Sequence, residues 1–380
     1  MKNGRSTFSQ FERRPARASV LVIVLVTLLF AAAALVAFID KASIDLIVES
    51  REATANRLRP EAYSALNVTL AVLEDFRLVN GGLRSEAEGW GDPLGFAGWS
   101  PREGCTAEVT FSDESAKLSL PNAESPALLN LFESWGLPRS EAERLTDALF
   151  SWMRKDYVPA SSWSADYDRG AIPYEAPLRS LRSYSELAAI DVARELFYDE
   201  EGRPNELWHR FSGAVSLLDF KQSNLNGANG DVLAAMGVAD PMQHKQIRDF
   251  LRGTGSRERL GPAFFESAEE AAGLIGAGKL PPSAGTTISA LRVNVLIREG
   301  RTTFLLSAVV APSSGGATLV PPSDLHADKS GRSPAAGNAP AAGRNAASGE
   351  QTKKLNYPFT LLEIAENAEI PTAPPEPTKE

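Results

Sequence analysis

The sequence contains few of the side chains that most enzyme chemistry requires. Among 380 residues there are one cysteine, Cys105, and three histidines, His209, His244 and His326. The histidines fit no metal-ligand spacing, and the chain has no GxSxG segment, no Walker loop and no cysteine matched to a catalytic histidine. A single cysteine cannot close an internal disulfide bond. We therefore expect a protein that is not an enzyme.

Basic residues are outnumbered as well. The chain carries 39 Lys and Arg against 48 Asp and Glu, a formal net charge of −9. Residues 1–18 hold five of the basic residues and one acidic residue, so the remainder has 34 basic and 47 acidic residues and a net charge of −13. An acidic surface repels phosphate backbones, which makes nucleic acid a poor ligand for this part of the chain.

A long uncharged run is the most prominent feature that the sequence does contain. Val20 to Ile39 is twenty residues without a charge, and as a helix it would span about 30 Å, the thickness of a bilayer core. The basic residues of 1–18 precede it, and basic flanks stay in the cytoplasm. The sequence thus predicts a cytoplasmic leader (1–18), one transmembrane helix (19–39) and an exported remainder. A cleaved secretory signal is the alternative, because Ala31 to Ala34 could supply a cleavage site.

The helical pattern continues past the uncharged run. Ile44, Ile47 and Val48 have helical spacing, and no Gly or Pro interrupts the chain before Pro60. We expect a helix over 40–78 on the exported side, with a kink at Pro60.

Two regions have strand character and flank a helical region. In the first, 100–120, CTAEVTF (105–111) and KLSL (117–120) predict two short strands in a hairpin. In the second, 286–311, Leu291, Val293, Val295 and Ile297 alternate on one face, and Glu299-Gly300 predicts a turn. Between them, 121–285 contains helical segments separated by loops. The pattern predicts an α+β protein in which a helical insert interrupts a small sheet.

The end of the chain divides into two parts. Residues 312–354 are rich in Pro, Gly, Ala and Ser without periodic apolar positions, which predicts a disordered linker. The tail, 355–380, begins with an apolar segment that could add either a strand or a short helix.

The helical region contains a weak internal repeat. Leu120 to Leu129 and Leu225 to Ala234 share a leucine, an Asn or Gly, an alanine and a second leucine, each opening a helix. This similarity suggests two small helical modules.

Together these features resemble the GspK family, the large minor pseudopilins of the type II secretion system. The resemblance covers about Arg17 to Pro312. Its most specific pieces are Asp113-Glu114 with Lys117 and Asn122, the segment from Ala165 through Tyr174, Ser183 to Leu187, and Asn224-Leu225-Asn226 with Ala228. The resemblance implies a long N-terminal transmembrane helix and a small antiparallel pseudopilin sheet, interrupted by an α-helical insert of the SAM-like or helix-hairpin-helix-like type.

The resemblance also implies a processing site and a place in a filament. A prepilin peptidase would cut between Ala18 and Ser19, and Val20, Ile23 and Ile39 would then lie in the filament core. Most pilin-like proteins have Glu at the fifth mature position, where this chain has Ile23. That carboxylate is thought to neutralise the N-terminal amine of a neighbour, since an unpaired charge in a membrane is costly. A subunit that enters first, at the tip, has no earlier neighbour to neutralise.

The implied function is to initiate the pseudopilus at its tip for export across the outer membrane. The implied partners are the minor pseudopilins I, J and H, the major pseudopilin, the prepilin peptidase and the assembly platform of the inner membrane. The resemblance places the chain in that membrane, with its C-terminal part in the periplasm.

Calcium sites are known in the helical domain of this family, but the acidic motif that usually ends the first helical module is absent from Ser151 to Arg154. The nearest oxygen donors are Asp156, Asp166, Asp168 and Glu175, which could hold Ca²⁺ if the loop folds them inward. Solvated loop acids are the alternative interpretation of the same residues.

Three other functions fit parts of the pattern. Helical modules behind one membrane helix also describe a competence-type DNA receptor, whose candidate turns here are Gly136-Leu137-Pro138 and Gly237-Val238-Ala239. These turns lack the second glycine of that motif. A minor pilin of a type IV pilus and an unprocessed bitopic structural protein are the remaining alternatives.

Overall fold

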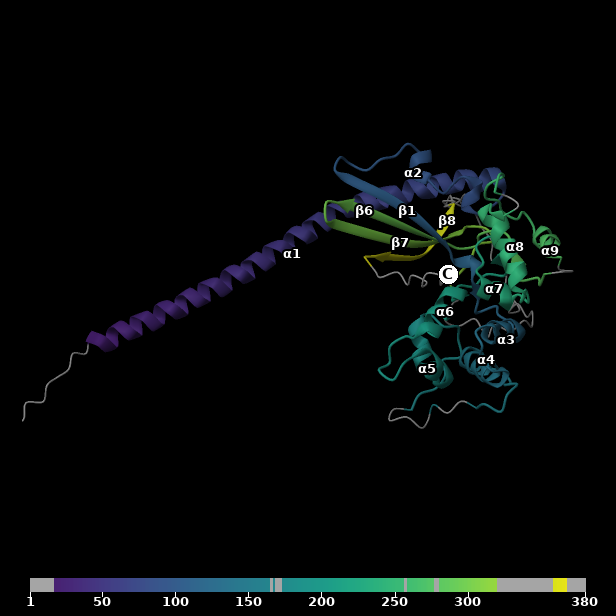
Figure 1. Ribbon diagram of the computed structural model, residues 1–380, viewed down its shortest axis with the longest axis horizontal. Coiled ribbons are helices and arrows are strands. Elements are labelled where there is room, and N and C mark those ends of the chain that lie inside the picture. Colours follow the sequence, from purple (N-terminus) through teal and green to yellow (C-terminus); the bar gives the residue numbers. More distant parts are fainter. Residues whose placement is uncertain are drawn as a thin grey trace, which may run out of the picture. The chain divides into compact units, whose positions relative to one another are not determined.

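The computed structural model describes residues 17–164, 167, 173–255, 258–276, 280–319 and 358–367 (Figure 1). Within the first helix, only the backbone is described for residues 17–21 and 46–55. The chain divides into two compact units, Met1–Leu58 and Arg59–Glu380, which are treated separately below.

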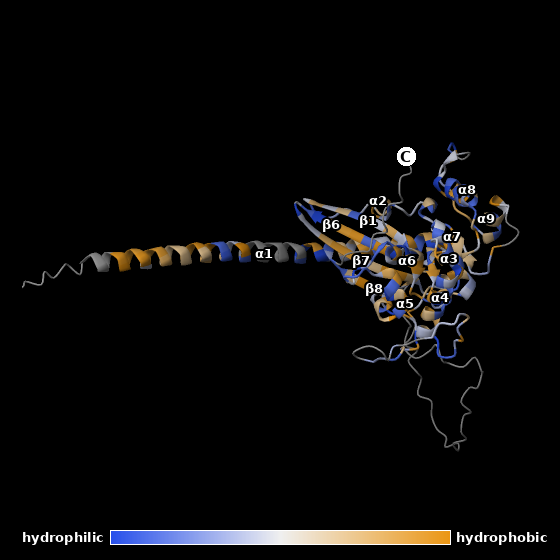
Figure 2. Cartoon of the chain, turned by 60° about the horizontal axis from the view of Figure 1, so that its bottom comes forward, coloured by the Kyte–Doolittle hydropathy of each residue, from blue (hydrophilic) through white to orange (hydrophobic). Residues whose placement is uncertain are grey.

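The first unit consists of the N-terminal part of helix α1, Arg17–Asn80. Its stretch Val22–Asp45 is long and apolar enough to cross a membrane, and none of it is buried within the structure. Large apolar side chains such as Leu25, Phe30 and Phe38 are about two-thirds exposed or more. Figure 2 shows this part of α1 as a hydrophobic run that ends in hydrophilic residues. Helices that are apolar on all sides belong in a protein core or in lipid, and no core surrounds this one.

In the second unit, the end of α1 has a single buried face. Ala62, Ala65, Leu66, Thr69 and Leu73 are all less than 5% exposed and recur at helical spacing. The helix continues without a break through Pro60. Proline removes one backbone donor, and packing of this buried face compensates for that loss.

The sheet has four antiparallel strands in the order β1-β6-β7-β8. These are β1 (Cys105–Asp113), β6 (Leu291–Glu299), β7 (Thr302–Pro312) and β8 (Phe359–Glu366). Strands β6 and β7 form the predicted hairpin, with Glu299 opposite Thr302. The predicted alternation is confirmed, since Leu291, Val293, Val295 and Ile297 are buried while the residues between them are partly exposed.

The hairpin predicted for 105–120 is wrong. Strand β1 pairs with β6 instead, and β2 (Leu118–Ser119) forms a parallel pair with β3 (Val215–Ser216). The reason is the turn between them, η2 (Glu114–Ala116), whose backbone N–H groups donate to the Asp113 carboxylate. This turn leads the chain away from β1 and into the helical block, so that β1 finds its partner about 180 residues later.

The helical block lies between β1 and β6, as predicted (Figure 1). It contains α3 (Ser125–Ser134), α4 (Arg139–Met153), η3 (Tyr184–Ala189), α5 (Asp191–Phe197), α6 (Glu206–Ala214), α7 (Gly230–Ala235), α8 (Pro241–Arg252) and α9 (Ala268–Leu274), with the short parallel pair β4 (Ser223–Asn224) and β5 (Ala284–Gly285). One continuous cluster of buried side chains runs through these helices, with Phe132, Phe197 and Phe211 at its centre. The two repeat-related segments therefore share one core, and their leucines Leu128 and Leu233 are both buried in it.

The segment after β7 corrects the predicted start of the linker. Residues 312–319 are folded onto the sheet, where Ala317 is 3% exposed and packs with Phe220 and Val309. Thr318 pairs with Asp219 through two backbone hydrogen bonds. Proline and glycine composition gave no signal of this contact, because its partners lie about 100 residues earlier. The remainder of the predicted linker, 320–354, lies outside the described residues.

The open question about the tail is settled in favour of a strand. β8 pairs with β7 from Leu306 opposite Glu366 to Pro312 opposite Phe359. Glu366 also accepts hydrogen bonds from Arg59 and Tyr63 at distances of 2.8 and 2.7 Å. The last strand is thereby tied to the part of α1 in the same unit.

Candidate functional site

The apolar part of α1 is the first candidate site. Ile23 and Ile39, predicted for the filament core, are 59% and 52% exposed and face no described neighbour in this unit. The predicted processing residues Ala18 and Ser19, with Val20, lie in the first turns of α1, where the backbone alone is described. The first charged residues after the apolar run, Asp40 and Lys41, are exposed. This segment offers a continuous apolar surface to lipid or to other helices.

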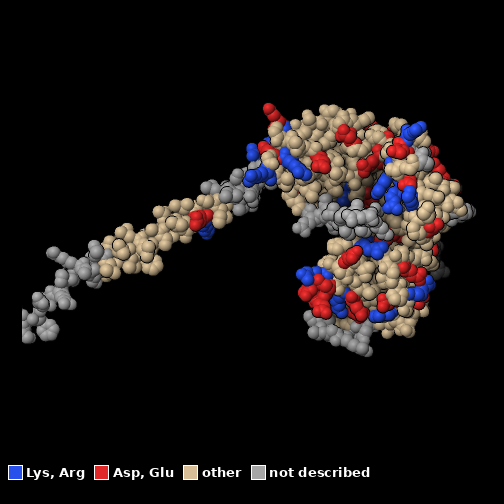
Figure 3. Space-filling model, viewed as in Figure 1, with Lys and Arg blue, Asp and Glu red and all other residues tan. Residues whose placement is uncertain are grey.

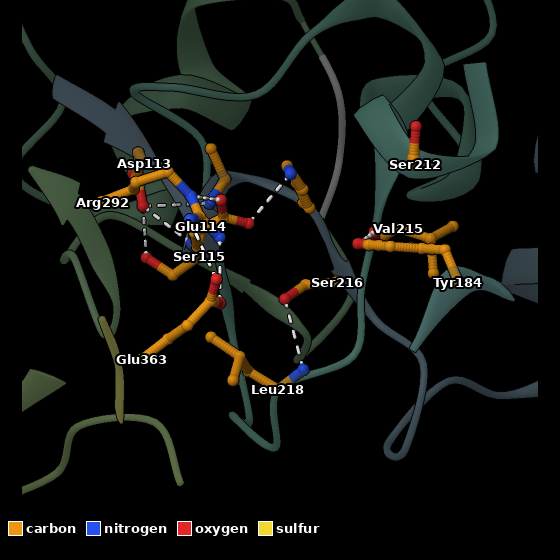
Figure 4. A network of polar contacts seen from close by, with 12 residues as sticks. Asp113, Glu114, Ser115, Tyr184, Ser212, Val215, Ser216, Leu218, Arg292 and Glu363 are labelled. Atoms are coloured by element: carbon orange, nitrogen blue, oxygen red, sulfur yellow. Dashed lines mark hydrogen bonds and ion pairs between the residues drawn. The ribbon is translucent and has the colours of Figure 1, made fainter. Parts of the chain in front are cut away.

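A second candidate site lies where the sheet meets the helical block, and we call it the polar junction (Figure 4). It consists of Asp113, Glu114, Ser115, Asn224 and Arg292. Four of these five residues belong to β1, η2 and β4, and Arg292 belongs to β6. The sequence analysis singled out Asp113, Glu114 and Asn224, and the structure brings them together.

Asp113 is the last residue of β1, and its carboxylate is surrounded by hydrogen-bond donors. One of its carboxylate oxygens accepts hydrogen bonds from the Ser115 N–H, the Ser115 hydroxyl and the Ala116 N–H, at 2.8, 2.6 and 3.1 Å. The other accepts from the Asn224 amide at 2.7 Å. Burial raises the pKa of Asp113 to about 6, while the hydrogen bonds from Ser115 and Asn224 oppose that rise.

Glu114 and Arg292 form a buried ion pair beside Asp113. The Arg292 Nε donates to Glu114 at 2.8 Å, and the Lys117 ammonium lies 2.8 Å from the other Glu114 oxygen. Burial alone would raise the pKa of Glu114, but Lys117 and Arg292 hold it below its usual value. Arg292 further donates to Ser307 on β7 and pairs with Glu363 on β8 at 3.3 Å. This one guanidinium therefore links strands β6, β7 and β8 to the turn η2 that follows β1.

Three asparagines extend the polar junction into the helical block. Asn224 donates to the Arg84 carbonyl, and Asn226 donates to the carbonyls of Phe265 and Thr286. Asn122 donates to the Phe220 carbonyl at 3.0 Å. Each amide connects segments that are distant in sequence, which explains why Asn rather than a residue of similar size occupies these positions.

The tyrosines of the other singled-out segments have a similar role. The Tyr184 hydroxyl donates to the Val215 carbonyl and the Tyr174 hydroxyl to the Ala189 carbonyl, both at 2.6 Å. Burial raises the pKa of Tyr184, so this hydroxyl stays a neutral donor. These contacts hold the loops of the helical block in place.

The possible calcium ligands are not gathered in the part of the chain that the structure describes. Asp156 and Glu175 are exposed, whereas Asp166 and Asp168 lie outside the described residues. The structure shows no group of three acidic, His or Cys residues fit for a metal among the residues it describes. The nearby Asp147 is buried and accepts hydrogen bonds from Tyr157, Ala160 and Ser161. Calcium binding therefore stays a prediction.

The backbone amides of the candidate DNA-binding turns form hydrogen bonds within the protein. Gly136 and Gly237 have φ values of 86° and 83° and end helices α3 and α7. The next residue in each case, Leu137 or Val238, donates its N–H back to the preceding helix at 3.2 and 3.0 Å. These two amides are therefore occupied as helix caps and are not presented to a phosphate.

Comparison with known proteins shows that one segment of the chain resembles a known family. Residues 111–200 match the family model "Type II secretion system (T2SS), protein K". This segment is similar to the protein K family. The matched segment begins two residues before Asp113 and contains Asp113, Glu114 and Ser115 of the polar junction and helices α3–α5. The predicted role as a minor pseudopilin in type II secretion is thereby confirmed, and no observation favours the alternative functions.

Two further comparisons were made. The chain is similar to a chain of the crystal structure of the GspK-GspI-GspJ complex from the enterotoxigenic Escherichia coli type 2 secretion system. The match has 14% sequence identity and a TM-score of 0.47, and it covers 69% of this chain and 92% of that chain. No curated protein matches the chain.

Sequence reasoning missed two members of the polar junction. Arg292 lies on the partly exposed face of a predicted strand, where a charged residue is ordinary, and its partner Glu114 is 178 positions away. Ser115 was not singled out by the sequence analysis. Neither position carries a local signal, since both roles arise from contacts between distant segments.

Replacing Asp113 by Asn should change how stability depends on pH. Because the folded-state pKa lies above the unfolded one, ionising Asp113 costs stability as the pH rises from about 4 to 6, by up to about 3 kcal/mol. For the full-length protein in detergent, we compare the free energy of unfolding of the wild type with that of the Asp113→Asn variant at each pH. The wild-type value minus the variant value should decrease as the pH rises from about 4 to 6. Urea titrations at each pH measure it. Asp75→Asn, at an exposed position, is the control, and a difference that stays constant with pH would contradict the prediction.

Calcium should raise the melting temperature if the loop acids bind it. Saturation at about 100 times the dissociation constant stabilises the folded state by about 2.7 kcal/mol. Thermal unfolding of the full chain with calcium, with magnesium and with chelator measures the effect. Asp156→Asn should abolish the calcium shift, and an unchanged melting temperature in calcium would refute the site.

Proposed function

We propose that this chain is the minor pseudopilin at the tip of the type II secretion pseudopilus and that it initiates filament assembly. The observation that carries the proposal is the protein K match at residues 111–200 in a chain that also has a membrane-length apolar helix. In this proposal the chain lies in the inner membrane with its C-terminal part in the periplasm. Its partners are the minor pseudopilins I, J and H, the major pseudopilin, the prepilin peptidase and the assembly platform.

The apolar helix supports a role in helix bundling. The exposed surface of Val22–Asp45 includes four consecutive alanines, 31–34, that permit close approach of a neighbouring helix. Ile23 places no carboxylate in this surface, as suits a subunit that has no earlier neighbour to neutralise.

The helical block supports a terminal position in the filament. It occupies most of the chain between β1 and β6, and its own buried core makes it a rigid body. A subunit with such a large insert leaves little room for another subunit above it. The block therefore acts as a cap in this proposal.

A structural, non-enzymatic role agrees with the polar junction. The Asp113 carboxylate is occupied by four hydrogen bonds and Glu114 by two cations, so neither group is poised as a base or a nucleophile. Their contacts fix the shape that the partner subunits would recognise.

The mature protein should begin at Ser19. N-terminal sequencing of the chain purified from membranes of a strain with an active prepilin peptidase measures this directly. Replacing Ala18 by a bulky residue such as Phe should block processing, whereas Ala18→Gly should preserve it. A purified native chain that still begins at Met1 would argue against the pseudopilin assignment of the N-terminus.

Deleting Val20 to Ile39 should abolish secretion while the remainder stays folded and soluble. Measuring exported protein in the medium, with circular dichroism of the remainder, tests both parts. A matched variant with twenty leucines in place of this segment keeps the membrane anchor but changes the packing surface. Secretion by the deletion variant would refute the proposal, and full secretion by the polyleucine variant would show that anchoring suffices without specific bundling.

A further inference from the structure

A cavity of about 520 Å³ lies beside the polar junction and is not used by the proposed assembly role. It is formed by η1 (Glu86–Glu88), the end of β1, the start of α7 and one side of α8. Its volume falls in the range of about 300–1,000 Å³ that is usual for small-ligand and peptide side-chain sites. Figure 3 shows Lys and Arg side chains gathered beside a hollow at α8.

The floor of the cavity is apolar. Phe111, Leu233, Ile247 and Leu251 line it, and the buried Trp90 packs edge-on against Phe111 with ring centroids 5.0 Å apart. Trp90 is held there by a hydrogen bond from its indole N–H to Glu88 at 3.0 Å. A rigid apolar floor of this kind suits one or two aliphatic or aromatic side chains.

The walls carry three arginines, Arg84, Arg248 and Arg252, against two carboxyl groups, Glu86 and Asp113. Arg84 pairs with Glu88 through one terminal nitrogen, but its buried Nε has no hydrogen-bond partner among the described residues. Arg252 is exposed at the rim and forms no ion pair with any residue that the structure describes. The Arg84 Nε and the Arg252 guanidinium, beside an apolar floor, favour a ligand with a carboxylate.

Glu86 adds an accessible hydrogen-bond acceptor to the cavity. Its carboxyl lines the cavity without a hydrogen bond or ion pair to any described residue, and burial raises its pKa. The Glu86 side chain is nevertheless exposed to solvent, so its carboxylate is accessible to a peptide N–H that enters the cavity.

We propose that this cavity binds a short acidic peptide segment of a partner protein. An acidic side chain of the segment pairs with Arg252 at the rim, a neighbouring apolar side chain occupies the floor, and a backbone N–H donates to Glu86. The alternative of a nucleic acid is disfavoured, because it carries a negative charge at every nucleotide and the chain has a net charge of −9.

This inference goes beyond the tip role and is tested separately from it. The probe is a fluorescein-labelled hexapeptide of alternating leucine and glutamate, and the measurement is fluorescence polarisation with the full-length protein in detergent at 0.15 M salt. A peptide with lysine in place of glutamate is the charge control. The acidic peptide should bind, and the basic peptide should bind at least about tenfold more weakly, a difference of about 1.4 kcal/mol.

Two variants locate the binding within the cavity. Arg252→Glu should weaken binding at least about tenfold, since it reverses the charge at the rim. Its control is Arg301→Glu, an exposed arginine in the β6–β7 turn at the other end of the sheet. Gly230→Leu should also reduce binding, because Gly230 lines the cavity and a Cβ added there would already lie 3.4 Å from the His244 ring. Its control is Gly273→Leu, where a side chain meets only open space.

The results separate the outcomes clearly. Loss of binding in both cavity variants, with unchanged circular dichroism and unchanged binding in both controls, supports the site. Equal affinity for the acidic and basic peptides, equal loss in the Arg252→Glu and Arg301→Glu variants, or displacement of the peptide by duplex DNA that binds more tightly would overturn it. None of these outcomes depends on whether the chain initiates a pseudopilus.

Discussion

The cost of burying two adjacent carboxyl groups is the constraint on which the fold of the second unit, Arg59–Glu380, depends. Asp113 and Glu114 lie where the sheet meets the helical block, and leaving a buried charge unpaired costs several kcal/mol. The cost is offset only when Ser115, Asn224 and Arg292 arrive together, from η2, β4 and β6. Because these elements come from distant parts of the chain, the network forms only in the complete fold and therefore favours one arrangement over others.

The same contacts join the two ends of the helical insert, which we call its neck. The chain leaves the sheet at Ser115 and returns at Ser289 and Ala290. The Ser115 hydroxyl accepts from the Ser289 N–H at 2.9 Å, and the Ser115 N–H donates to the Ala290 carbonyl at 3.2 Å. Joining the ends of so long an insertion carries an entropic cost that grows only slowly with its length. A few strong hydrogen bonds at the neck can therefore hold a whole helical block on a small sheet.

Periodicity in the sequence predicted the elements whose structure is local. The apolar helix, the β6–β7 hairpin and helices α3, α4 and α8 follow from spacing and turn residues that lie within each segment. The pairing of β1, the folded segment at residues 312–319 and the role of Arg292 did not follow. Each depends on a partner about 100 or more positions away, for which a single sequence carries no signal. Within the candidate site, the conspicuous Asp and Asn residues were found, but the residues that pair with them were missed.

The position of the cavity couples ligand binding to the neck. Asp113 lies in the cavity wall and at the same time receives the Ser115 and Asn224 hydrogen bonds that hold the insert in place. A ligand that binds only the folded form stabilises every contact on which its site depends, by an amount set by its concentration relative to its dissociation constant. Occupation of the cavity would thus strengthen the attachment of the helical block to the sheet. In a filament subunit this would link recognition of a partner segment to the rigidity of the domain that carries it.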